Sequence, residues 1–123
     1  MQAKSPEGGG MDAVGISVKH EENYFFLRFD QIIYLAASGR RTVIHSTRGE
    51  FVLPRLLGNV SRRLPDNPFM KVHRSYIVNV RWIRCLRPSD RGDCVVEMDD
   101  TEDSTIPVSR KHAIALKQKL RIL

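Results

Sequence analysis

Apolar residues occur in this chain as short runs, and the longest run, residues 32–37, has only six members. The runs are rich in β-branched and aromatic residues, and polar residues, glycines or prolines separate them. Such runs are typical of β-strands, whereas a membrane-spanning helix needs roughly 18 consecutive apolar residues. The pattern therefore predicts a mainly β protein that does not cross a membrane. Because the first ten residues contain no apolar stretch that could serve as a signal-peptide core, we expect a cytoplasmic protein.

The same patterns predict individual elements. Strands are predicted at residues 16–18, 24–29, 32–35, 42–47, 50–53, 69–72, 76–80, 81–86, 94–98 and 105–108. A helix is predicted over residues 53–64, where Pro54 suits the first turn, Pro65 follows the end and five apolar side chains fall at helical spacing: Leu53, Leu56, Leu57, Val60 and Leu64. A second amphipathic helix is predicted over residues 109–121.

The chain is expected to hold one domain and a tail. Residues 1–14 combine a Ser-Pro pair, a glycine triplet and few apolar groups, so they cannot bury enough surface to offset the entropy of ordering. We interpret them as a flexible tail or a linker remnant. Residues 15–123 then form one domain of ordinary length.

Positive charge is concentrated in two segments. Residues 71–87 hold five basic side chains and residues 104–123 hold another five, with no acidic residue in either segment. The rest of the chain holds the other 10 basic and all 14 acidic residues, which leaves −4 there and +6 in total. This concentration is expected if one face meets a polyanion. The alternative is that solvated strand and helix faces are basic by composition alone.

Motifs of common enzymes are missing from the sequence. It holds no nucleophile elbow, phosphate-binding loop, zinc-protease helix or dinucleotide fingerprint, so we expect no catalytic residue and no enzyme. The four histidines are scattered, and Cys85 and Cys94 lack the spacing of a zinc site and are expected to be free thiols. The acidic run 99–103 lacks the ligand spacing of a calcium loop and is interpreted as a solvated turn. We expect neither a metal nor a cofactor.

Polar groups that recognise nucleic acids gather near residues 71–80. His73, Arg74, Ser75 and Asn79 surround a predicted bend between two strands. Arginine can grip guanine at two atoms, and serine and asparagine can bond phosphate or adenine. For Arg74 we favour a contact with a ligand, whereas for His73 and Asn79 we favour hydrogen bonds to the backbone of the turn.

The start of the predicted C-terminal helix carries a second basic group. Ser109 is a favourable N-cap, and Arg110, Lys111 and His112 follow it in the first turn. Cations there oppose the helix dipole, at a cost of roughly 0.3–1 kcal/mol each. Their placement is explained if an anion binds, because exposed N–H groups and basic side chains both favour phosphate. A small, tolerated penalty at an exposed helix end is the alternative.

Three segments together resemble one family. FMKVHRSYIVN at residues 69–79 and IPVSRKH at residues 106–112 closely resemble the paired signature of LytTR-type DNA-binding domains, the output modules of many bacterial response regulators. IIYLAASGRRTVIHS at residues 32–46 resembles that family's second strand, turn and third strand. The resemblance implies a mainly β fold, an elongated sandwich of small, mostly antiparallel sheets with a short amphipathic helix in mid-chain and a C-terminal helix.

The resemblance also implies a function. It implies sequence-specific binding of double-stranded DNA in bacterial transcriptional regulation, with loops that enter successive major grooves of a bent duplex. By motif position, the residues that contact DNA would be Arg40, Arg41, Arg74, Ser75, Arg110 and Lys111. His73, Asn79 and His112 would shape the loops or make secondary contacts.

Two departures from the family limit what can be carried over. Members commonly have an acidic residue in place of Ala36 and a polar–aromatic pair in place of Arg40 and Arg41, so the base preference of this turn is not inherited. The receiver domain that usually precedes such a module is absent from this chain, which is then a fragment of a larger regulator or a stand-alone one.

The expected partner is duplex DNA, and a repeated site bound by a homodimer is one form that the complex can take.

Two other functions stay open at this point. Tyr24, Phe25, Phe26, Tyr76 and Trp82 could stack on RNA bases, although core packing explains them better. The basic face could instead meet an acidic protein partner.

Overall fold

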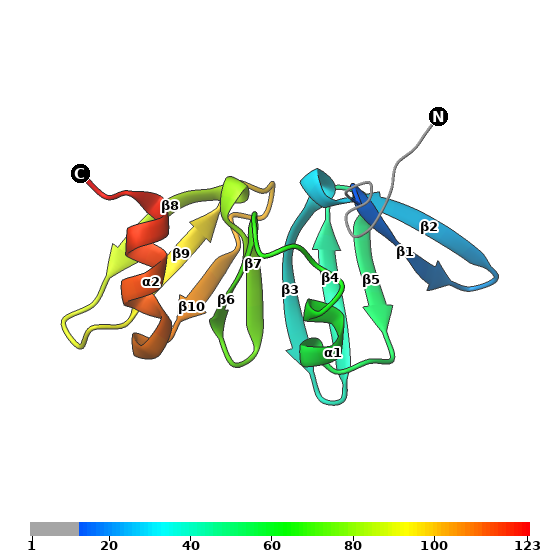
Figure 1. Cartoon of the computed structure of the whole chain (residues 1–123), viewed down its shortest axis with the longest axis horizontal. Helices are drawn as coiled ribbons and strands as arrows, with labels where there is room; N and C mark the ends of the chain where they lie inside the picture. The colour runs from blue at the N-terminus through cyan, green and yellow to red at the C-terminus, as the bar shows by residue number, and fades with distance from the viewer. Residues whose placement is uncertain (1–12) are drawn as a thin grey trace.

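The computed structural model describes residues 13–123, which form a row of small antiparallel sheets (Figure 1). The strands are β1 (Gly15–His20), β2 (Asn23–Arg28), β3 (Ile32–Ser38), β4 (Arg41–Ser46), β5 (Gly49–Leu53), β6 (Phe69–His73), β7 (Tyr76–Asn79), β8 (Ile83–Pro88), β9 (Cys94–Met98) and β10 (Thr105–Val108). The helices are α1 (Leu57–Ser61) and α2 (Arg110–Leu120), with 3₁₀ turns η1 (Phe29–Gln31) and η2 (Val80–Trp82). The expected fold class is confirmed.

A central sheet separates two hydrophobic cores. Within the described residues the sheets are β1-β2, β5-β4-β3-β7-β6 and β10-β9-β8. Successive residues of a strand point to opposite faces, so Ile77 packs with α1 and β2 in one core while Val78 packs with β9, β10 and α2 in the other. Each end of the molecule is thus attached to one face of the central sheet.

The predicted mid-chain helix is much shorter than expected. Only Leu57–Ser61 is α-helical, because Leu53 pairs with Thr42 as the last residue of β5. Leu57, Val60 and Leu64 do pack in the core, but Leu56 is 47% exposed. The apolar spacing was therefore correct over one turn of helix and coincidental at its start.

The predicted strand boundary at residues 80–81 is also wrong. Val80–Trp82 forms the 3₁₀ turn η2, in which the Asn79 side chain accepts a hydrogen bond from the Arg81 N–H at 3.0 Å. An asparagine side chain competes in this way with the strand ladder. Similarly, Phe29 leaves the predicted strand 24–29 and begins η1.

The expected tail falls almost entirely outside the described residues, which begin at residue 13. The Val14 carbonyl accepts a hydrogen bond from the Phe29 N–H at 2.8 Å. In residues 13–123 no helix has the length and apolar character needed to cross a membrane.

Candidate nucleic-acid interface

The three predicted DNA-contacting segments lie along one edge of the molecule. Figure 1 shows the β3–β4 turn, the β6–β7 turn and the start of α2 side by side along its lower edge. We call this the basic edge, defined by Arg40, Arg41, Arg74, Arg110 and Lys111. All five side chains belong to exposed residues, and none of them forms an ion pair with a residue in the described part of the chain.

Backbone hydrogen bonds hold the three segments at fixed spacing. The Ala37 N–H of β3 donates to the Ser75 carbonyl at 2.8 Å, and the Ser109 N–H donates to the Val72 carbonyl of β6 at 2.9 Å. The β6–β7 hairpin is thus bonded to a neighbour on each side. A constellation carried on strands in this way is held more rigidly than one carried on free loops.

The β3–β4 turn is a tight hairpin connection. Ser38 pairs with Arg41, so only Gly39 and Arg40 form the loop, and Gly39 has φ +61°, a value that favours glycine. Thr42 is fully buried next to this turn, and its Oγ1 donates to the Arg55 carbonyl at 2.8 Å. Arg40 and Arg41 therefore project from an anchored turn.

A histidine shapes the β6–β7 turn. His73 Nδ1 accepts a hydrogen bond from the Ser75 N–H at 3.1 Å, and its ring meets Tyr76 edge-on. A neutral imidazole that accepts at Nδ1 carries its proton on Nε2. Arg74 stands exposed at the apex, while Ser75 is half-buried.

Asn79 lies away from the basic edge. Its side chain is fully buried and donates to the carbonyls of Phe29 and Ile32 at 3.1 and 2.9 Å. It therefore connects β7 to η1 and the start of β3, and it has no surface with which to touch a duplex.

The start of α2 departs from the expected cap. Ser109 occupies the N-cap position, but its hydroxyl lies 2.7 Å from His112 Nδ1 and makes no capping bond to the backbone. Burial lowers the pKa of His112, and the charges of Lys111 and Lys71 lower it further. His112 is half-buried, whereas Arg110 and Lys111 are exposed.

A hollow at the α2 end of this edge contains residues that the sequence had not singled out. It lies between the β8–β9 loop, β10 and the start of α2, and it is lined in part by Arg87, Arg91, Asp93, Arg110 and His73. Arg87 pairs with Glu97, while Arg91 is exposed. Arg87 belongs to the basic segment 71–87, and Arg91 lies between the predicted strands 81–86 and 94–98. Only the β8–β9–β10 pairing brings both next to Arg110.

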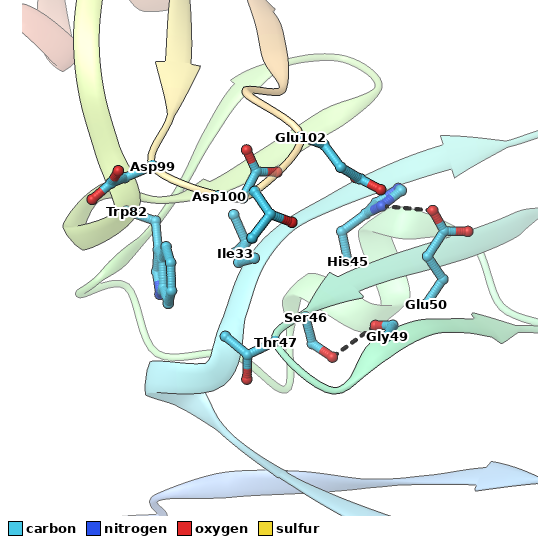
Figure 2. Close-up of a pocket in the computed structure, with 11 residues that line it drawn as sticks. Ile33, His45, Ser46, Thr47, Gly49, Glu50, Trp82, Asp99, Asp100 and Glu102 are labelled. Atoms are coloured by element: carbon cyan, nitrogen blue, oxygen red, sulfur yellow. Dashed lines mark hydrogen bonds and ion pairs between the residues drawn. The ribbon is translucent and has the colours of Figure 1, made fainter.

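The opposite edge is acidic. Figure 2 shows a hollow where the β9–β10 loop faces the β4–β5 turn, with Asp99, Asp100, Glu102 and Glu50 among its lining residues. His45 Nδ1 lies 3.2 Å from the Glu50 carboxylate. These carboxylates oppose the approach of a polyanion from this side.

Comparison with known proteins gives a consistent family. The family of LytTr DNA-binding domains matches residues 22–121. The CO-responsive transcriptional regulator RcoM of Rhodospirillum rubrum is 34% identical over 74% of this chain and 38% of its own length. The sensory transduction protein LytT of Bacillus anthracis is 31% identical over 83% of this chain and 41% of its own length.

The structure agrees with these matches. A solved LytTr DNA-binding domain from Bacillus cereus superposes with a TM-score of 0.78 at 23% identity, covering 90% of this chain and all of that one. The chain spans about two fifths of the length of the curated relatives it matches, which also include the transcriptional regulatory protein YpdB of Escherichia coli at 25% identity over 87% of this chain and 43% of its own length.

Proposed function

We propose, because this chain belongs to the family of LytTr DNA-binding domains, that it binds duplex DNA sequence-specifically and acts in the regulation of transcription. Family membership supports DNA binding in transcription regulation, and the matched relatives are named as regulators, which is consistent with a protein that is not an enzyme. The observation that carries the proposal is the alignment of three basic segments on one edge, opposite an acidic one.

Each segment has a distinct part in the proposed complex. As the family resemblance implies, the three segments enter successive major grooves of a bent duplex. Their place in a row along one edge, in two strand turns and at the start of α2, supports this arrangement. Arg110, with its planar fork, reads a guanine edge, and Lys111, a flexible point charge, holds a phosphate. Arg40, Arg41 and Arg74 supply the remaining groove and backbone contacts, with Ser75 beside Arg74.

RNA binding fits the aromatic side chains less well. Phe25, Tyr76 and Trp82 pack against the two cores, and the Trp82 Nε1–H donates to the Asp30 carbonyl at 3.0 Å. Tyr24 and Phe26 are exposed, but they lie on the β1–β2 hairpin at the far end of the molecule from α2 (Figure 1). No exposed aromatic platform in the described residues borders the basic edge.

The test separates base reading from charge. Duplexes selected from a random pool give a preferred site, and binding is titrated on that site and on a scrambled one. Arg110→Ala should lose about 1–3 kcal/mol on the preferred site and flatten discrimination, whereas Lys111→Ala should weaken both duplexes alike and lower the salt slope by about one. Absence of retardation by any duplex, with binding to an acidic protein retained, would instead support the protein-interaction alternative.

A further inference from the structure

The stem of Arg110 lies across the backbone of the β8–β9 loop. A Cβ atom built on Gly92 would lie 3.3 Å from Cγ, 3.5 Å from Cδ and 3.7 Å from Nε of Arg110. Gly92 also has φ +93°, a conformation that glycine adopts without strain. The loop therefore passes directly under the arginine side chain, and any larger residue at position 92 would press against it.

The next residue in the loop is an acid. Asp93 lines the same hollow as Arg110, and the Ser89 hydroxyl donates to its carboxylate. This hydrogen bond lowers the pKa of Asp93, and the charges of Arg91 and Arg110 lower it further. Among the described residues, Arg110 has no carboxylate within 4 Å. Asp93 therefore acts on the Arg110 guanidinium through its charge rather than through a direct ion pair, and the guanidinium N–H groups stay available to a ligand.

A carboxylate is an unexpected group at this position. Its charge opposes the binding of a polyanion, so it lowers the affinity for every duplex. It can also favour one orientation of the neighbouring guanidinium, whose five N–H donors exceed the two that a guanine edge uses. An orientation that is favoured before binding reduces the entropy lost when the contact forms.

From this geometry we propose that Gly92 and Asp93 are positioning residues, which hold Arg110 in the orientation that reads a base and direct it away from phosphate. The inference rests on the proposed function in one respect, that Arg110 reads a base. It adds a fourth segment, the β8–β9 loop, which acts on specificity through Arg110.

Neutralising Asp93 tests the proposal. Asp93→Asn keeps an oxygen that can accept the Ser89 hydrogen bond and removes the charge. Asp90→Asn is the matched control, because Asp90 is an exposed acid of the same loop that does not line the hollow. Both variants should bind the scrambled duplex somewhat more tightly than the parent does, since each removes one negative charge.

Of these two variants, Asp93→Asn alone should lower the ratio of preferred to scrambled affinity. The expected decrease is about three- to tenfold, which is part of the discrimination that one bidentate arginine contact supplies. Equal ratios in the two variants would overturn the proposal. Gly92→Ala is the second variant and should lower the ratio as well, because its methyl group displaces the arginine stem. If Asp93→Asn melts like the parent but Gly92→Ala does not fold, the comparison of Asp93→Asn with Asp90→Asn still tests the positioning role.

A double-mutant cycle separates this proposal from the one it rests on. In the Arg110→Ala background, Asp93→Asn should leave the discrimination ratio unchanged. If Arg110→Ala alone leaves the ratio unchanged, base reading by Arg110 is wrong. If Arg110→Ala lowers the ratio and Asp93→Asn does not, base reading stands and the positioning role is wrong.

Discussion

Asn79 is the buried polar side chain whose removal tests the fold most directly. It is fully buried, donates to the Phe29 and Ile32 carbonyls and accepts from the Arg81 N–H. Asn79→Leu keeps a side chain of similar size and removes all three hydrogen bonds. Because the bonds join β7 to η1, β3 and η2, their loss affects the centre of the fold.

The magnitude follows from the groups left behind. A buried polar group without a partner costs about 1–3 kcal/mol. The Phe29 carbonyl keeps the N–H of Ile32 as a donor, so the main losses fall on the Ile32 carbonyl and the Arg81 N–H. We therefore expect the free energy of unfolding to fall by about 2–4 kcal/mol, out of the 5–15 kcal/mol typical of a domain.

Urea denaturation followed by far-UV circular dichroism measures this loss, with Trp82 fluorescence as a second probe. Asn59→Leu is the control, because Asn59 is exposed on α1 and its replacement should change stability by less than about 0.5 kcal/mol. The folded fraction of Asn79→Leu should bind DNA with parental affinity. A stability loss below about 1 kcal/mol would refute the reasoning on unpaired groups, and a stable variant that no longer binds DNA would make Asn79 a contact residue.

Three further results are expected. If about six phosphates are neutralised, affinity should fall roughly 10³-fold between about 50 and 200 mM salt, and a salt-insensitive complex would contradict the basic edge. Arg74→Ala should weaken DNA binding about tenfold, whereas Arg28→Ala, on the opposite edge beside Asp30, should not; equal losses would contradict the orientation. Burial holds the pKa of His112 below its ordinary 6.5. In the pH window from about 6.5 down through the pKa of the folded state, the unfolded chain therefore binds more protons than the folded chain does. Stability should therefore fall as pH drops through that window, and melting curves should show a smaller fall for His112→Gln.

Local patterns were enough to predict most strands, the C-terminal helix and one turn of the mid-chain helix, because short β-branched runs and turn residues act within a few positions. Pairing over long distances was beyond them. The separation of Ile77 and Val78 into two cores depends on what packs on each face of the central sheet, and the approach of Gly92 to Arg110 joins residues that no local pattern relates. The placement of Arg40, Arg74 and Arg110 on one edge was expected from family resemblance rather than from residue chemistry.

The adjacent residues Leu56 and Leu57 show how a periodic pattern fails and provide a last test. Helical spacing assigned both to one buried stripe, but Leu57 is 5% exposed and Leu56 is 47% exposed at the N-cap of α1, where no side chain caps the helix. Leu57→Ser should cost at least the roughly 2–5 kcal/mol of a buried leucine truncation.

Leu56→Ser loses about half of a leucine's burial, near 1 kcal/mol, and gains a cap worth about 0.5–2 kcal/mol. Its stability should therefore stay within about 1 kcal/mol of the parent. Urea denaturation of the two variants gives both values under the same conditions. Equal and large losses would mean that Leu56 is buried and that the helix begins earlier than Leu57, as its spacing alone had suggested.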